Sequence, residues 1–216
     1  MLASRGLTLR SILITHHHPD HIGGVAELCV GRNVKVIAPV DERIPHADRR
    51  VGHGDVVTLD LPAARFEVMA VPGHTTSHIA YAGEGLLFCG DTMFSLGCGR
   101  LFEGTPAQML DSLDQLLSLP DDTLVCCGHE YTQTNARFAL TIDGDNAALK
   151  ARAKEVEEKR SRGEPTLPST MGMERAANPF LRTDSDAIAA WATREADAHD
   201  RVSRFTALRN AKDTFR

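Results

Sequence analysis

The chain has 216 residues, 42% of them hydrophobic, and its 24 basic and 29 acidic side chains give a formal net charge of -5. This length suits one domain of ordinary size with a smaller unit, and the apolar content is sufficient for a buried core. A general binder of nucleic-acid backbones normally carries a basic surface, so the acidic balance argues against a nucleic-acid partner. The acidic balance is still compatible with a local basic pocket that binds a small anion.

The first two-thirds of the sequence alternates short apolar runs with Gly, Pro and Asp, which predicts strands and turns. The predicted strands cover residues 12–14, 34–38, 56–59, 66–71, 86–89 and 124–127. One helix is predicted after Gly23–Gly24. Another begins at Thr105, followed by Pro106 and then Gln108 in the pattern of a capping box. Strands interleaved with helices predict a layered α/β or α+β domain.

The composition changes after about residue 133, where Ala, Lys, Glu and Arg follow a helical spacing. The predicted helices cover residues 135–161, 186–198 and 202–213, and prolines interrupt the chain between the first two. We therefore predict a strand-rich domain over residues 1–133 and a small helical subdomain over residues 134–216.

The five cysteines include no CxxC pair, so neither a zinc ribbon nor a dithiol redox motif is indicated. Unpaired thiols are typical of a reducing, intracellular compartment. No apolar stretch approaches the roughly 20 residues that a membrane span needs. Residues 1–10 also lack the apolar core of a signal peptide. We therefore expect a cytoplasmic protein that has no membrane partner.

The segment from Thr15 to His21 places four potential metal ligands directly after the first predicted strand. A strand that ends in a tight loop presents alternating side chains, so His16 and His18 can face one metal. Asp20 and His21 follow one loop turn later and can face a second metal. Imidazole and carboxylate are typical ligands of zinc, iron and manganese. The alternative is a chance histidine-rich turn, which the interposed Pro-Asp and the preceding strand disfavour.

Three further candidate ligands, His74, Asp91 and His129, each follow an apolar run and a glycine. The glycine permits a close backbone turn that aims the next side chain at a shared point. Asp91 can bridge two ions, because one carboxylate offers an oxygen to each. Singly, each residue is more often structural; together with the first segment they predict a two-metal site.

These segments resemble the motifs of a known family. THHHPDH at 15–21 is similar to the THxHxDH signature of the metallo-β-lactamase superfamily, whose fold is an αββα sandwich. PGHTTSH at 72–78, GDTMFSLGCGRLFEG at 90–104 and GHEYTQTNARFA at 128–139 resemble glyoxalase II, the hydroxyacylglutathione hydrolase family. The resemblance extends from Thr15 to the C-terminus. It implies an α+β, metallo-β-lactamase-type domain with a C-terminal helical subdomain that binds glutathione.

The resemblance also implies a ligand set for two divalent metals. The first metal is expected on His16, His18 and His74. The second is expected on Asp20, His21 and His129, with Asp91 as the bridge. Zinc is the expected metal, and this donor set also tolerates iron or manganese.

The expected reaction is hydrolysis of S-D-lactoylglutathione to D-lactate and glutathione, the second step of methylglyoxal detoxification. Two adjacent cations can hold a bridging hydroxide at neutral pH, because each lowers the pKa of bound water. That hydroxide would attack the thioester carbonyl, and the weakly basic thiolate leaves with little acid assistance. Asp20 and Asp91 are the expected catalytic carboxylates, Asp20 as ligand and hydroxide orienter and Asp91 as bridge.

Four residues match family positions that contact glutathione: Arg100, Tyr131, Arg209 and Lys212. Arg209 and Lys212 match basic residues that reach the glycine carboxylate, and an arginine fork suits such a group. The alternative for these two residues is a solvated helix face. Phe102 replaces a tyrosine of some members, so one polar contact is expected to be absent.

Two other histidines are expected to support the site rather than bind metal. His17 should point away from the metals, because strand alternation sends it opposite to His16 and His18. His78 lies four residues after His74, and we expect it among the hydrogen-bonding groups around the ligands.

Family members carry additional residues before the position of Ile12, so the first strands of one sheet are expected to be missing here. Their absence would expose a sheet edge and part of the core, which predicts poor solubility or marginal stability for the 216-residue chain.

Three other functions are compatible with parts of the pattern. A persulfide dioxygenase of the same superfamily uses one iron, and the basic last helix argues against it. An RNase Z-like nuclease would have a similar metal site, and the acidic balance argues against it. The third is a catalytically inactive metal-binding remnant. We expect a monomeric enzyme.

Overall fold

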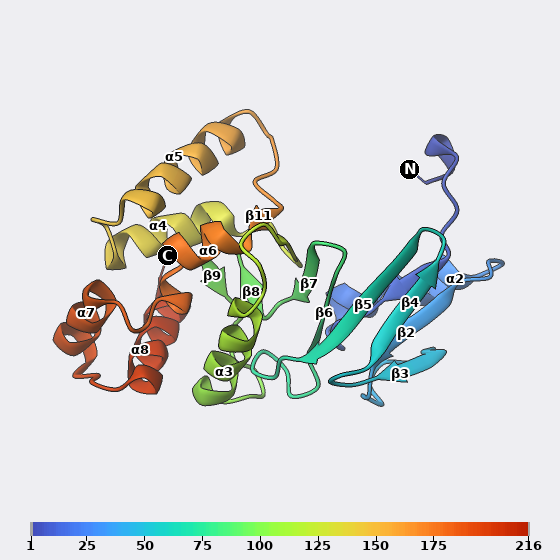
Figure 1. Ribbon diagram of the computed structural model, residues 1–216, viewed down its shortest axis with the longest axis horizontal. Coiled ribbons are helices and arrows are strands. Elements are labelled where there is room, and N and C mark those ends of the chain that lie inside the picture. The colour runs from blue at the N-terminus through green and yellow to red at the C-terminus, as the bar shows by residue number, and fades with distance from the viewer. Residues whose placement is uncertain (1, 216) are drawn as a thin grey trace.

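The computed structural model describes residues 2–215, and two β-sheets form its centre (Figure 1). The three-stranded sheet has the order β1-β2-β3, and its neighbouring strands are parallel. Its strands are β1 (Ser11–Leu13), β2 (Lys35–Pro39) and β3 (Arg49–Val51).

The six-stranded sheet has the order β11-β10-β7-β6-β5-β4 and is antiparallel except where β7 and β10 pair in parallel. Its strands are β4 (Val56–Asp60), β5 (Ala63–Ala70), β6 (Ile79–Gly83), β7 (Leu86–Gly90), β10 (Leu124–Cys127) and β11 (Ser169–Thr170). A separate antiparallel ribbon joins β8 (Met93–Phe94) to β9 (Gly97–Cys98).

The helices before and beside the sheets are η1 (Ala3–Arg5), α1 (Pro19–Ile22), α2 (Val25–Cys29) and α3 (Pro106–Leu117). Those of the C-terminal part are α4 (Thr132–Ile142), α5 (Ala147–Ser161), α6 (Met171–Ala177), η2 (Pro179–Leu181), α7 (Asp186–Ala196) and α8 (Arg201–Thr214). Figure 1 shows α4 to α8 gathered at one end of the molecule. None of the helices within residues 2–215 has the length and apolar character needed to cross a membrane.

The two sheets pack face to face through alternating apolar side chains. Ile37 and Val51 of the three-stranded sheet share one buried cluster with Val57, Phe66 and Tyr81 of the six-stranded sheet. This cluster is the inner layer of the sandwich.

Helices cover the outer faces of both sheets. Val25 of α2 packs in one cluster with Val36 of β2. On the other side Leu113 of α3 packs with Leu87 of β7 and Val125 of β10. The order of layers is therefore helix, sheet, sheet, helix, and the α+β sandwich predicted from the resemblance is confirmed.

Helix α3 begins as the sequence predicts. The Thr105 hydroxyl accepts from the backbone N–H of Gln108 at 3.2 Å, and the Gln108 side chain accepts from the Thr105 N–H at 2.9 Å. The box satisfies two N–H groups that would otherwise lack partners. It fixes the start of the helix that covers the six-stranded sheet.

The single helix predicted over residues 135–161 is wrong, because the chain forms α4 and α5 there. Helix α4 ends before Asp143, and Asn146 starts α5 by accepting from the backbone N–H groups of Ala148 and Leu149. A capping side chain competes with helix continuation, and the Asp143-Gly144 step weakens it further. The sequence pattern also missed β3, β6 and α6.

The buried Tyr81 joins the two sheets next to the candidate metal ligands. Its hydroxyl donates to the carbonyl of Ile14, one residue after β1, at 2.9 Å. We expect Tyr81→Phe to lower the free energy of unfolding by about 1–2 kcal/mol, because the carbonyl loses its partner in the interior. Thermal denaturation measures the change, with Tyr131→Phe at a half-exposed tyrosine as the control. Equal melting temperatures for the two variants would contradict this role.

Candidate metal centre and pocket

All seven predicted ligands lie just beyond strand ends and converge on one region. They follow β1 (His16, His18, Asp20 and His21), β5 (His74), β7 (Asp91) and β10 (His129). Their nitrogen and oxygen atoms form three groups, in each of which the donor atoms lie within 4.8 Å of one another. The groups are His16–His18–His74, His16–His21–Asp91 and Asp20–His21–His129.

The three-histidine group brings one ring nitrogen of each histidine close together. His16 Nδ1 contacts the Thr15 hydroxyl at 3.1 Å, while its buried Nε2 has no hydrogen-bond partner within residues 2–215. His74 Nδ1 donates to the Arg100 carbonyl at 2.8 Å, and its Nε2 lies 2.9 Å from His18 Nδ1. An unpartnered buried nitrogen is costly, so this arrangement fits a divalent cation.

The second group is more open. His129 Nε2 lies 3.2 Å from Asp20 Oδ2 and 3.3 Å from His21 Nε2. The Asp20 side chain is 58% exposed, so this side of the centre faces solvent. Two imidazoles and a carboxylate are again suitable donors for a divalent metal.

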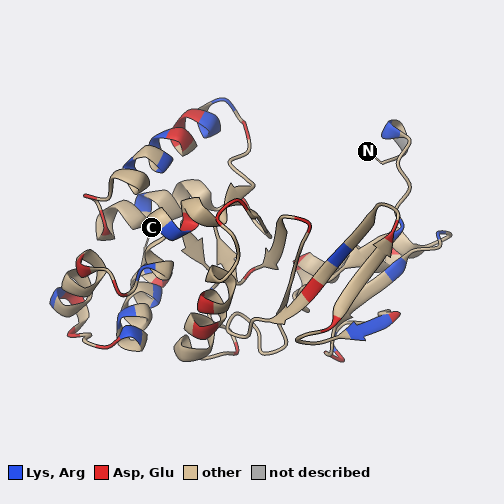
Figure 2. Cartoon of the chain, viewed as in Figure 1, with Lys and Arg blue, Asp and Glu red and all other residues tan. Residues whose placement is uncertain are grey.

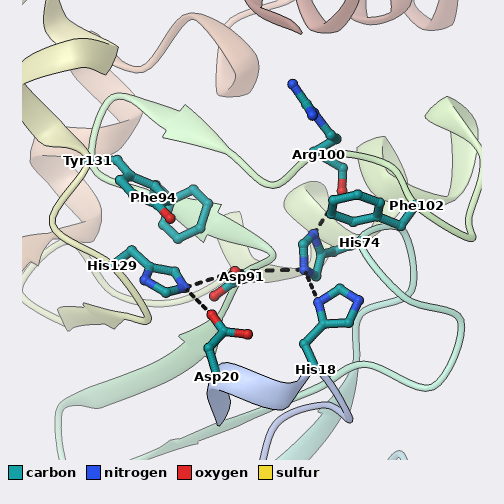
Figure 3. A pocket seen from close by; sticks show the side chains of 9 residues that line it. All are labelled: His18, Asp20, His74, Asp91, Phe94, Arg100, Phe102, His129 and Tyr131. Carbon is teal, nitrogen blue, oxygen red and sulfur yellow. Dashed lines mark hydrogen bonds and ion pairs between the residues drawn. The ribbon is translucent and has the colours of Figure 1, made fainter.

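Asp91 lies between the two groups, as Figure 3 shows. Its Oδ1 is 3.2 Å from His21 Nε2, and its Oδ2 is 3.3 Å from His129 Nε2 and 3.7 Å from His74 Nε2. The carboxylate is largely buried. Although burial acts to raise its pKa, the hydrogen bond from His21 and the nearby imidazoles lower the pKa below its usual value. Asp91 is therefore ionised and faces both groups.

The buried imidazoles are held in their neutral form. Burial, reinforced by the other histidines, lowers the pKa of His16 far below its ordinary value. Burial likewise lowers the pKa of His78 to about 3. A neutral imidazole keeps a lone pair available, which is the form that binds metals.

His78 contacts two of the candidate ligands. Its Nε2 accepts from the backbone N–H of Asp91 at 3.2 Å, and its ring stacks on His16 with centroids 4.5 Å apart. His17 is absent from all three donor groups, and its ring nitrogens lie near Asp41 and Glu103 instead. His17 therefore lies outside the candidate donor groups, in agreement with the expected alternation.

The glycines before the ligands act in two different ways. Gly73 and Gly90 have φ angles of 152° and 49°, so the predicted turn geometry holds there. Gly128 has no such φ angle. A Cβ atom at Gly128 would lie 2.4 Å from Asp91 Oδ1 and 2.9 Å from His21 Cε1. Gly128 therefore provides space for the ligands.

A pocket of about 540 Å³ opens beside the donor groups. It is lined by His18, Asp20, His74, Asp91, Phe94, Arg100, Phe102, His129 and Tyr131 (Figure 3). The ring of Tyr131 stacks on His129 at 4.9 Å, and Phe94 contacts Tyr131 edge to face at 5.2 Å. On the other side Phe102 contacts His18 and His74. The pocket thus combines an anionic and imidazole floor with aromatic walls.

The four predicted glutathione contacts divide into two pairs. Arg100 and Tyr131 line the pocket, whereas Arg209 and Lys212 are not among its lining residues. The buried Arg209 donates to the Cys98 carbonyl at 2.8 Å. Lys212 Nζ lies 5.7 Å from the centre of the Phe138 ring. These contacts are more extensive than those expected of a solvated helix face.

The sequence pattern missed two residues of this region, Phe94 and Asp213. Asp213 Oδ1 accepts from Arg100 Nε at 3.1 Å and from Arg209 Nη2 at 3.0 Å, and so links the pocket wall to α8. The spacing of four residues between Arg209 and Asp213 was a usable signal for one of these bonds. No local pattern indicates the bond to Arg100.

Comparisons with solved structures agree with the fold and with a metal centre. The crystal structure of ETHE1 from Myxococcus xanthus superposes with a TM-score of 0.64 at 28% identity, covering 98% of this chain and 79% of that one. The crystal structure of TTHA1623 in a di-iron-bound form gives a TM-score of 0.58 at 25% identity, and the match covers 83% of this chain and 81% of that one. A centre for divalent metals is consistent with both the donor groups and the fold.

Sequence comparisons identify the family. Residues 2–129 match the metallo-β-lactamase superfamily, and residues 130–215 match the hydroxyacylglutathione hydrolase C-terminus. The hydroxyacylglutathione hydrolase of Xanthomonas campestris pv. campestris (strain B100) is 53% identical over 214 residues, which cover 98% of this chain and 83% of that protein. The hydroxyacylglutathione hydrolase of Cupriavidus metallidurans is 50% identical over 228 residues, which cover 100% of this chain and 86% of that protein. With the strand-end donors and the helical C-terminal part, these matches show that the chain belongs to the hydroxyacylglutathione hydrolase family of the metallo-β-lactamase superfamily.

Proposed function

We propose that this chain hydrolyses hydroxyacylglutathione thioesters, with S-D-lactoylglutathione as the substrate and D-lactate and glutathione as the products. The observation that carries the proposal is Asp91, whose carboxylate faces both donor groups at the floor of the pocket. The family membership supports the same reaction.

Two divalent metals are the proposed cofactors. One metal would be held by His16, His18 and His74. The other would be held by Asp20, His21 and His129, and Asp91 would contact both metals. We propose zinc, with iron or manganese as alternatives for this donor set. When bound, such metals lower the pKa of water and stabilise negative charge on oxygen.

The chain's own groups orient the substrate and the metals. We propose that Asp20, on the solvent side, acts as both ligand and orienter of water, and that Arg100 and Tyr131 hold glutathione at the pocket wall. Arg209 and Lys212 would bind its glycine carboxylate from α8, where Asp213 already links Arg209 to Arg100. Residues 1–133 would carry the metals together with Arg100 and Tyr131, and residues 134–216 would supply Arg209 and Lys212 to glutathione, although the boundary falls inside α4.

The remaining expectations concern partners and compartment. We propose a monomeric, cytoplasmic enzyme whose partner is a small molecule. Figure 2 shows acidic and basic residues alternating along α5, where Lys154 pairs with Glu158 and Lys159 with Glu155. This alternation is typical of a solvated helix face and does not favour a nucleic-acid surface.

The direct test is hydrolysis of S-D-lactoylglutathione by the purified chain, with metal content determined on the same sample. Turnover with close to two metals per chain supports the proposal. Bound metal without turnover contradicts the proposed substrate. Oxygen consumption with glutathione persulfide would then identify a persulfide dioxygenase.

Arg100→Ala tests the glutathione contact. We expect KM to rise about 10- to 100-fold with little change in kcat, because a hydrogen bond to a charged group contributes about 1.5–3 kcal/mol. Steady-state kinetics measure the effect. Arg162→Ala is the matched control, since Arg162 is also an exposed arginine paired with a carboxylate, Glu164. An equal loss with S-lactoyl-N-acetylcysteamine, which lacks the glutathione carboxylates, would contradict this role for Arg100.

A further inference from the structure

A charged cluster to which the sequence analysis assigns no role lies next to the three-histidine group. It consists of Asp41, which follows β2, Arg43 two residues later, and Glu103 in the loop before α3. We call these three residues the clasp. None of them is a candidate metal ligand or lines the pocket.

Arg43 joins two carboxylates that are 62 residues apart in the sequence. Its Nε donates to Asp41 Oδ1 at 2.9 Å and its Nη2 to Asp41 Oδ2 at 2.8 Å. Its Nη1 donates to Glu103 Oε1 at 2.5 Å. The hydrogen bonds from Arg43 lower the pKa of Glu103 to about 2 and hold the pKa of Asp41 well below its usual value, so both carboxylates are ionised at neutral pH.

Both carboxylates also hold the loop that follows His74. The Ser77 hydroxyl donates to Asp41 Oδ2 at 2.5 Å. The backbone N–H and the hydroxyl of Thr76 each donate to Glu103 Oε2 at 2.9 Å. The segment directly after a candidate metal ligand is therefore fixed by both ends of the clasp.

The clasp reaches the other two histidines through His17. His17 Nδ1 lies 3.5 Å from Asp41 Oδ2, and its Nε2 lies 3.6 Å from Glu103 Oε1. His17 stands between His16 and His18 in the chain, so a constraint on its ring constrains both neighbours. Its side chain is 14% exposed, which leaves it little freedom to move.

Glu103 further belongs to the loop that orients the His74 ring. The Arg100 carbonyl accepts from His74 Nδ1 at 2.8 Å, and the Phe102 N–H donates to the His74 carbonyl at 3.3 Å. The hydrogen bond to Nδ1 fixes the tautomer that leaves Nε2 free. Partners of this kind typically alter metal affinity 10- to 100-fold.

We propose that Asp41, Arg43 and Glu103 act as positioning residues that hold His16, His18 and His74 in the geometry of one metal. The inference rests on the proposed metal centre. The Arg43 side chain is 49% exposed and the Asp41 side chain only 4%, so the clasp also contributes to folding, and the metal-free melting temperature must be measured beside metal affinity. The contacts of the clasp connect the turn after β1 with the two loops that carry and orient His74.

The test compares Arg43→Gln and Arg43→Lys with the control Arg162→Gln, which removes the exposed bidentate partner of Glu164. Zinc affinity is measured without substrate by competition with a chelator, and melting temperatures are measured on the metal-free proteins. In Arg43→Gln we expect one zinc to bind about 10- to 100-fold more weakly and the other to keep its affinity. Arg43→Lys should have an intermediate zinc affinity, because lysine keeps the charge but lacks the planar guanidinium that donates to two carboxylates at once.

The outcomes separate the clasp from the proposed function. Two zinc ions bound to the parent chain and equal affinities in all variants would overturn the clasp alone. If Arg43→Gln lost zinc affinity and its metal-free form also melted at a lower temperature by an equivalent free energy, the positioning role would be overturned. The clasp would then act on folding alone. A parent chain that does not bind two metals would overturn the metal centre and the clasp together. Retained zinc binding without thioester hydrolysis would contradict only the proposed substrate.

Discussion

Asp91→Ala is expected to remove metal from the protein and to lower turnover of S-D-lactoylglutathione by about 100-fold or more. The reason is that Asp91 Oδ2 lies near both His74 and His129, while Oδ1 lies near His21, so one truncation affects both donor groups. Asp91→Asn keeps the volume and removes the charge, and it should also lose metal. Metal per chain and kcat are measured on the same preparations.

The exposed Asp122 supplies the matched control, since Asp122→Ala removes an equal side chain that belongs neither to the donor groups nor to the pocket lining. Melting curves of the metal-free variants show whether they fold. If Asp91→Ala retained two metals and turned over within about threefold of the parent chain, the shared-carboxylate assignment would be wrong.

Gly128→Ala is the second large effect expected, although it adds only one methyl group. The new Cβ would lie 2.4 Å from Asp91 Oδ1, and the backbone cannot retreat freely because the Gly128 N–H donates to the Gly90 carbonyl at 2.9 Å. We expect the ligand to be displaced and metal affinity to fall about 10- to 100-fold or more. Chelator competition and kcat measure the loss.

Gly24→Ala is its control, because a Cβ there has no heavy atom within 4 Å and Gly24 also lies close in sequence to candidate ligands. Its metal affinity should equal that of the parent chain. Unchanged affinity in Gly128→Ala would mean that the ligands tolerate displacement, against the tight packing inferred here.

The sequence was most informative where the determinants are local. The four donors from His16 to His21 lie in one turn, and the capping box of α3 involves residues three apart. The remaining predicted donors could be recognised because each follows a strand and a glycine. The ligand roles themselves and the division at residue 133 stay predictions.

Features that depend on packing between distant segments could not be read from the sequence. Arg43 and Glu103 are 60 residues apart, and Arg100 and Asp213 are 113 apart. Neither pair follows a strand or helix period, so only the folded chain brings them together. The division between α4 and α5 was missed for a different reason, because a capping asparagine outweighed a continuous helical composition.

Arg100 contributes to two parts of the protein at once. Its backbone carbonyl accepts from His74, and its side chain donates to Asp213 on α8. A ligand that draws the guanidinium away from Asp213 acts on the same residue that fixes the tautomer of His74, a candidate metal ligand. We therefore expect metal occupancy and glutathione affinity to be thermodynamically linked through Arg100, in which case reciprocity requires each to change the other by the same factor.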